Sequence, residues 1–157
     1  MSVIERKEIY KKIEEMRGHP LITYVTSQRR NATGAMAADV IQQFTKQLLE
    51  IPSETKEVDF LIVSNGGDPT VAWRVISLLR EKFDRIYALL PYEAFSAATL
   101  LALGADEIIM HPFSNLGPVD PQLGYQKKSG EKVSFGAEDL RHFMEFVRED
   151  VGIKEDT

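Results

Sequence analysis

Two short segments of the 157-residue sequence carry residue types suited to acyl-transfer chemistry. In the first, Gly66 and Gly67 lie between the apolar run VDFLIVS and an Asp-Pro pair that would start a helix. Glycines at this place can adopt positive φ and leave backbone N–H groups at a helix N-terminus, where an oxyanion is stabilised. A tight turn that serves only the fold uses the same residues. The pair is therefore a candidate oxyanion site with a structural alternative.

Ser96 is the candidate nucleophile of the second segment. It lies among the small residues Ala94, Ala97 and Ala98, between a predicted strand and an uncharged helical stretch. A serine at such a turn can present its hydroxyl to a carbonyl carbon, as in the nucleophile elbow, although the G-x-S-x-G pattern is absent. An N-cap or a small packing residue is the structural alternative, and the spacing alone favours it.

Alternating strands and helices must position these two segments. Apolar and β-branched runs predict strands over residues 21–25, 58–64, 85–90 and 106–111. Apolar residues at helical spacing predict helices over residues 2–18, 40–51, 69–83, 94–103 and 138–151. The Gly- and Pro-rich residues 115–132 are expected to form a loop. This order predicts an α/β fold with a parallel sheet, in which loops at the carboxyl ends of strands form the binding crevice.

The composition limits the class of protein. With 43% hydrophobic and 27% charged residues, the sequence is typical of a single globular domain, which we expect to span residues 1–157. The net charge of -5 disfavours nucleic-acid binding, and the absence of cysteine excludes a thiol nucleophile or a disulfide framework. No spacing of histidines and carboxylates indicates a metal, and we expect no cofactor.

The distribution of charge also bears on localisation. No uncharged run reaches the about 18 residues needed to span a bilayer, and the N-terminus is too charged for a signal peptide. We therefore expect a cytoplasmic protein with no membrane span. The charged residues 153–157 are expected to be either a frayed tail or the point at which a longer chain is truncated.

Three ordered motifs carry a resemblance to a known family: VSNGGDPTVAWRVISLLR, PYEAFSAATLLALGADEIIM and SNLGPVDPQ. Together they resemble the serine dehydrogenase proteinase family of the ClpP/crotonase superfamily, which also holds signal peptide peptidase A and the Clp protease proteolytic subunit. The resemblance implies a ClpP/crotonase-like β-β-α superhelix with a mainly parallel sheet. It also implies a serine endopeptidase that cleaves peptide or protein substrates and assembles into a homo-oligomer.

The resemblance assigns roles to four residues. Ser96 matches the nucleophile, the N–H groups of Gly66 and Ala97 match the oxyanion donors, and Gly67 is expected to contact the substrate. One departure lies beside them, because Asn65 stands where relatives often have proline. Asparagine adds a backbone N–H and makes the turn more adaptable, but it does not prevent an oxyanion site.

The general base is where the sequence departs most from the family pattern. The Clp subunit uses a histidine, and the corresponding stretch near Val119 and Asp120 has none, while His111 is expected to be structural. Signal peptide peptidase A uses a lysine, but the matching place near Glu138 holds no lysine. We choose Lys128, from the preceding lysine-rich loop, as the base of a Ser-Lys pair. A solvated surface loop is the alternative for these lysines.

Two other functions fit the same residues. A scaffold or peptide-binding oligomer would keep both segments only because they pack, and the absence of an obvious base favours it. A crotonase-like acyl-coenzyme A enzyme would use two backbone N–H groups to hold a thioester oxyanion and would need no serine.

Overall fold

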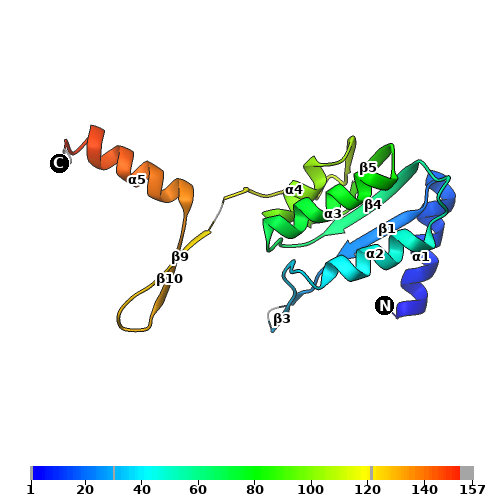
Figure 1. Ribbon diagram of the computed structural model, residues 1–157, viewed down its shortest axis with the longest axis horizontal. Coiled ribbons are helices and arrows are strands. Elements are labelled where there is room, and N and C mark those ends of the chain that lie inside the picture. The colour runs from blue at the N-terminus through cyan, green and yellow to red at the C-terminus, as the bar shows by residue number, and fades with distance from the viewer. Residues whose placement is uncertain (1, 30, 121, 153–157) are drawn as a thin grey trace. The chain divides into compact units, whose positions relative to one another are not determined.

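The computed structural model describes residues 2–29, 31–120 and 122–152. The chain divides into two compact units, one ending at Val119 and the other beginning at Asp120. Each unit is described by itself (Figure 1). The predicted tail, residues 153–157, lies outside the described residues. The single domain predicted over residues 1–157 stays a prediction.

A four-stranded parallel sheet is the centre of the first unit (Figure 1). Its strands are β1 (Leu21–Val25), β4 (Glu57–Val63), β5 (Arg85–Leu90) and β7 (Glu107–Met110), in the order β1-β4-β5-β7. All three neighbouring pairs are parallel. The four predicted strands and the parallel α/β fold are therefore confirmed.

The described residues of this unit form four helices, whose ends follow from local sequence. They are α1 (Val3–Arg17), α2 (Val40–Glu50), α3 (Pro69–Lys82) and α4 (Ala97–Leu103). Ser2 and Glu5 form the capping box of α1, and Gly18 ends that helix in the left-handed conformation. Asp68 caps α3 through a hydrogen bond from the Thr70 N–H. None of the described helices combines the length and apolarity needed to cross a membrane.

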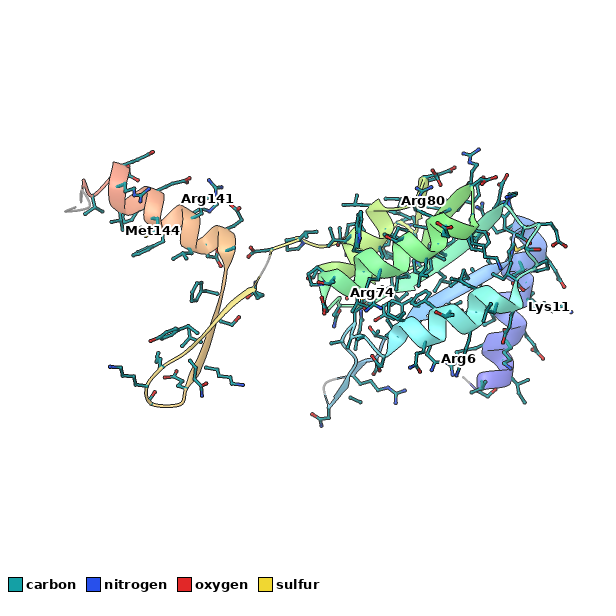
Figure 2. The ribbon with its side chains drawn as sticks, in the orientation of Figure 1. Arg6, Lys11, Arg74, Arg80, Arg141 and Met144 are labelled. Carbon is teal, nitrogen blue, oxygen red and sulfur yellow. The ribbon has the colours of Figure 1, made fainter. Side chains whose placement is uncertain are left out.

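The core lies between the sheet and helices α2, α3 and α4. Alternate residues of the strands, such as Ile22, Phe60 and Ile86, are fully buried on one face. Phe44 of α2 packs edge-on against Phe60, with ring centroids 5.6 Å apart. α1 is peripheral and contributes no buried residue; its exposed side chains include Lys11 (Figure 2).

β1 is an edge strand of the sheet, and side chains occupy two of its backbone donors. The N–H of Leu21 donates to Oε1 of Glu14 at 2.8 Å, and the N–H of Thr23 donates to Oε1 of Gln47 at 3.2 Å. Because Glu14 lies on α1 and Gln47 on α2, the strand edge is also tied to both flanking helices.

Short strands surround the carboxyl end of the sheet. β2 (Gln28–Arg29) pairs with β3 (Ala32–Thr33), and β6 (Glu93–Ala94) pairs in parallel with β8 (Asn115–Leu116). The helix predicted over residues 94–103 is wrong at its start, because residue 94 is in β6 and α4 begins three residues later. Backbone pairing of this segment with Ser64 outweighs its helical composition.

The second unit is a β-hairpin followed by a helix. β9 (Gln122–Gln126) pairs antiparallel with β10 (Lys132–Gly136), and α5 (Ala137–Glu149) follows. The loop predicted over residues 115–132 is therefore wrong in part, because β8, β9 and the start of β10 fall within it. The last predicted helix is confirmed as α5, from which Arg141 and Met144 project (Figure 2).

Candidate active site

Ser96 lies at a sharp turn between β6 and α4. Its φ of 50° and ψ of -123° make it the one described residue other than glycine with positive φ. Such a conformation costs an ordinary residue of order 1–3 kcal/mol and persists only where the surrounding structure holds it. Ser96 occupies the N-cap position of α4, yet its side chain makes no capping hydrogen bond. Ser96 is therefore the N-cap of α4 by position, as the structural alternative expected, but its hydroxyl does not cap the helix.

Gly66 packs directly against this turn. A Cβ atom at Gly66 would lie 2.5 Å from the Phe95 carbonyl oxygen, 2.8 Å from the Ala97 nitrogen and 2.9 Å from Cβ of Ser96. The φ of Gly66 is also positive, at 88°. Glycine is needed here both for its conformation and for the close approach of the two backbones. The structure thus brings the two segments predicted from the sequence into contact.

The backbone N–H groups of these turns differ in their partners. The N–H of Gly66 donates to Oγ of Ser64 at 3.1 Å, and the N–H of Asp68 donates to the Met36 carbonyl at 2.9 Å. Within the described part of the chain, the N–H groups of Gly67 and Ala97 have no hydrogen-bond acceptor. Two backbone donors therefore remain available beside Ser96, one on each of the contacting segments.

Two buried residues that the sequence analysis did not single out hold the turns in place. The backbone of Ser64 accepts from the Phe95 N–H at 2.9 Å and donates to the Glu93 carbonyl at 3.0 Å. The Thr99 hydroxyl, on α4, donates to the Ala94 carbonyl at 2.7 Å and accepts from the Gly117 N–H at 3.2 Å. The available signal was a hydroxyl residue in an apolar setting: Ser64 follows an apolar strand, and Thr99 interrupts an apolar helix.

A small group of hydroxyls lies under the Gly66 turn. Oγ1 of Thr26 lies 3.0 Å from Oγ of Ser64. The Tyr24 hydroxyl is buried nearby and makes no hydrogen bond of acceptable geometry within the described residues. Burial raises the pKa of Tyr24, and the neighbouring Ser64 hydroxyl lowers it by a smaller amount.

Lys128 lies in the second unit, in the turn between β9 and β10, and its side chain is exposed. The neighbouring Lys127 pairs with Glu131, its Nζ lying 2.9 Å from Oε2. Ser96, Gly66, Gly67 and Ala97 all belong to the first unit. The pairing of Lys128 with Ser96 therefore stays a prediction.

The histidines have structural surroundings. Nδ1 of His111 accepts a hydrogen bond from the Phe113 N–H at 3.2 Å, which agrees with the structural role expected for it. His19 lies between Asp59 and Glu57, with nitrogen–oxygen distances of 3.5 and 3.3 Å. The sequence analysis missed this contact because His19 belongs to no motif. No cluster of three or more histidine, aspartate or glutamate side chains in the described ranges could hold a metal ion.

Sequence comparison identifies relatives of this chain. The sequence model of the ClpP-like SDH-type serine proteinases matches residues 1–134. MJ1495 of Methanocaldococcus jannaschii, named as an uncharacterized protein, is 28% identical over 149 residues, covering 84% of this chain and 50% of its own. MJ0137 of the same organism, also named as uncharacterized, is 29% identical over 128 residues, covering 77% and 44%. The chain thus spans about half the length of the relatives it matches.

Solved structures with the same fold include two of 1510-N, described as a membrane-bound stomatin-specific protease. One is a serine-to-alanine mutant, with a TM-score of 0.55 and 17% identity, covering 82% of this chain and 58% of its own. The other is a lysine-to-alanine mutant in complex with a substrate peptide, with a TM-score of 0.54 and 18% identity, covering 82% and 55%. At this identity the likeness shows the fold, a ClpP-like α/β architecture with a mainly parallel sheet. Because the sequence match covers most of the chain and the fold agrees with it, the chain belongs to the ClpP-like SDH-type serine proteinase family.

Proposed function

We propose that this protein is a serine peptidase and that Ser96 is its nucleophile. The observation that carries the proposal is the contact between two turns with positive φ, one at Ser96 and one at Gly66. Backbone strain of this kind is concentrated at functional sites. Here the Ser96 hydroxyl, which makes no capping hydrogen bond, lies beside the unpaired N–H groups of Gly67 and Ala97. The family to which the chain belongs supports the same chemistry.

The reaction follows from these groups. The Ser96 oxygen attacks the carbonyl carbon of a peptide bond while its proton passes to a general base. The resulting oxyanion accepts hydrogen bonds from the Ala97 N–H and from the Gly66–Gly67 turn. Because the Gly66 N–H already donates to Ser64, we extend the predicted donor pair of Gly66 and Ala97 to include the unpaired Gly67 N–H. Loss of one such donor raises the barrier by about 2.7 to 4 kcal/mol.

The second half of the reaction releases the products. Collapse of the tetrahedral intermediate breaks the C–N bond, and the base returns its proton to the leaving amine. Water then attacks the acyl group on Ser96 with the help of the same base, which restores the serine and releases the acid. The substrate class is peptide or protein, and we propose that the enzyme works as a homo-oligomer.

We propose Lys128 as the base of a Ser-Lys pair. A lysine must be neutral to accept the serine proton, and burial in the assembled enzyme would favour the neutral amine. The lysine-to-alanine mutant of 1510-N that was solved with a substrate peptide supports a lysine in such a site. Alanine variants of Lys127, Lys128 and Lys132 test the assignment, because only the loss of the true base should abolish reaction of Ser96 with a probe.

Covalent labelling tests the proposed function. The full chain is treated with a fluorophosphonate, and its intact mass and oligomeric state are measured beside those of Ser96→Ala. We expect one adduct in the wild-type protein and none in the variant. An intact oligomer without an adduct would contradict the peptidase function and support the scaffold. Binding of a coenzyme A thioester that Ser96→Ala leaves unchanged would instead support the acyl-coenzyme A alternative.

A further inference from the structure

Ser64 connects the two segments that form the proposed site. It is fully buried at the end of β4. Its backbone donates to the Glu93 carbonyl and accepts from the Phe95 N–H, at 3.0 and 2.9 Å. These two bonds fix the segment that leads into Ser96. A residue directly after β4 thus sets the position of the nucleophile turn.

The side chain of the same residue fixes the opposite segment. Oγ of Ser64 accepts from the Gly66 N–H at 3.1 Å and lies 3.0 Å from Oγ1 of Thr26. Thr26 follows β1 and is itself held by a hydrogen bond from its N–H to the Val63 carbonyl at 2.9 Å. The Ser64 hydroxyl is therefore held by Thr26 and in turn restrains the Gly66 turn.

This restraint matters because the glycine turn packs so closely on the Ser96 turn that a small shift of either backbone would produce a collision. Gly66 is in van der Waals contact with the Phe95–Ala97 backbone, and both Gly66 and Ser96 have positive φ. Glycine has more conformational freedom than any other residue, so a Gly-Gly pair needs an external contact to keep one geometry. The buried hydroxyl of Ser64 supplies that contact to the Gly66 N–H, while the Met36 N–H donates to the Gly66 carbonyl and the Met36 carbonyl accepts from the Asp68 N–H.

We infer that Ser64 is a positioning residue, whose hydroxyl holds the Gly66–Gly67 turn in register with the Ser96 turn and thereby places the backbone donors for the oxyanion. The placement of donors for an oxyanion rests on the proposed function, whereas the restraint of the glycine turn does not. Ser64 does not touch the reacting atoms, because its Oγ is occupied by Gly66 and Thr26. Its effect on the reaction passes entirely through the glycine turn.

Two measurements on the full chain test this inference. Hydrogen exchange at the Gly66 amide, measured by NMR, reports the hydroxyl contact without any need for activity. The rate of Ser96 labelling by a fluorophosphonate reports the proposed site, and its dependence on probe concentration separates the bonding step from probe affinity. Thermal unfolding is recorded for each variant as a check on folding.

The expected effects follow from the loss of one hydrogen bond. In Ser64→Ala, Gly66 exchange should rise by about tenfold, and the maximal labelling rate should fall by about fivefold to tenfold with little change in probe affinity. Ser64→Thr keeps a hydroxyl and should restore most of the rate. Ser77→Ala is the matched control, because it removes a hydroxyl that donates within α3, to the Trp73 carbonyl at 2.8 Å, and both readouts should stay within about twofold of wild type.

Several outcomes would overturn the inference. If the Gly66 amide exchanges at the wild-type rate in folded Ser64→Ala protein, the Ser64 hydroxyl does not restrain Gly66. If exchange is faster but Ser96 is labelled at the wild-type rate, Ser64 does not position the oxyanion donors. If Ser64→Ala does not fold, Thr26→Val, which loses the hydroxyl beneath Ser64, must change both readouts in the same direction. Wild-type protein that takes no label refutes the proposed function, whereas the exchange measurement still decides whether Ser64 restrains the turn.

Discussion

Arg17 and the buried carboxylate of Asp59 form a two-point ion pair. Nε of Arg17 lies 3.0 Å from Oδ2 of Asp59, and Nη2 lies 2.9 Å from Oδ1. Asp59 is fully buried in β4, and Arg17 is the last residue of α1. The hydrogen bond to Asp59 raises the pKa of Arg17, so the guanidinium stays charged. This pair joins a peripheral helix to the centre of the sheet.

Removal of Arg17 should therefore destabilise the protein strongly. Among the described residues, Arg17→Ala leaves the buried Asp59 carboxylate with His19 as its remaining ion-pair partner, and we expect a loss of about 2–4 kcal/mol in the free energy of unfolding. Lys11→Ala is the control, because the exposed Lys11–Glu15 pair, at 3.8 Å, should contribute about 0.5 kcal/mol or less. Urea denaturation measures both, and equal losses in the two variants would contradict the prediction.

Gly66→Ala should abolish Ser96 labelling. The new methyl group would collide with backbone atoms of Phe95 and Ala97, which cannot move without shifting the nucleophile turn. We expect a stability loss of about 3 kcal/mol or more from strain and overpacking together. Gly18→Ala is the matched control: its φ of 76° is similarly positive, but no atom lies within 4 Å of the added carbon. Only the conformational cost, about 1–2 kcal/mol, should appear there, with labelling retained.

Asp106 should contribute stability that is lost in acid. The hydrogen bond from the Ile86 N–H, with the Arg80 guanidinium, lowers the pKa of Asp106. Because the folded pKa lies below the unfolded pKa, the contribution is present above the unfolded pKa and disappears as the pH falls through the folded one. Asp106→Asn should cost about 1 kcal/mol at neutral pH and progressively less in acid. Denaturation at a series of pH values measures this, and a pH-independent cost would contradict it. Arg80 is labelled in Figure 2.

Trp73 should matter little for stability despite its size. Its side chain is 71% exposed on α3. We expect Trp73→Ala to change the free energy of unfolding by less than about 0.5 kcal/mol. Phe83→Ala, at a buried position of the same unit, should cost about 3–5 kcal/mol. A large loss from Trp73→Ala in a monomer would show that the indole packs against the protein.

The sequence predicted those parts of the fold that depend on local patterns. The apolar run of β4 is typical of a strand covered on both faces, and Asp68 and Pro69 define the start of α3 where it was expected. The hairpin of β9 and β10 escaped prediction because each strand has only two apolar residues at alternate positions, Leu123 and Tyr125 in one and Val133 and Phe135 in the other, among Gly, Pro and Lys residues typical of a loop. Ala94 was misassigned because its pairing with Ser64, 30 residues earlier by number, is not a local property.

The candidate site divides in the same way. Ser96, Gly66 and Ala97 could be selected from their residue types and from the resemblance to a family. Their mutual contact depends on β6 lying beside the end of β4, which no spacing in the sequence indicates. The inferred role of Ser64 depends on the same arrangement. Periodicity describes one element at a time, whereas the position of a base such as Lys128 depends on how separate elements assemble.

The side-chain caps on β1 have a consequence for colloidal behaviour. A bare edge strand offers unpaired N–H and C=O groups as a template on which strands of other molecules can add, and this is a route to aggregation. Glu14 and Gln47 fill two of those donor positions in β1 with oxygens from the same chain. An incoming strand would have to displace both side chains before it could pair with these two donors and extend the sheet. Side chains of the two helices thus oppose the addition of further strands at this edge of the sheet.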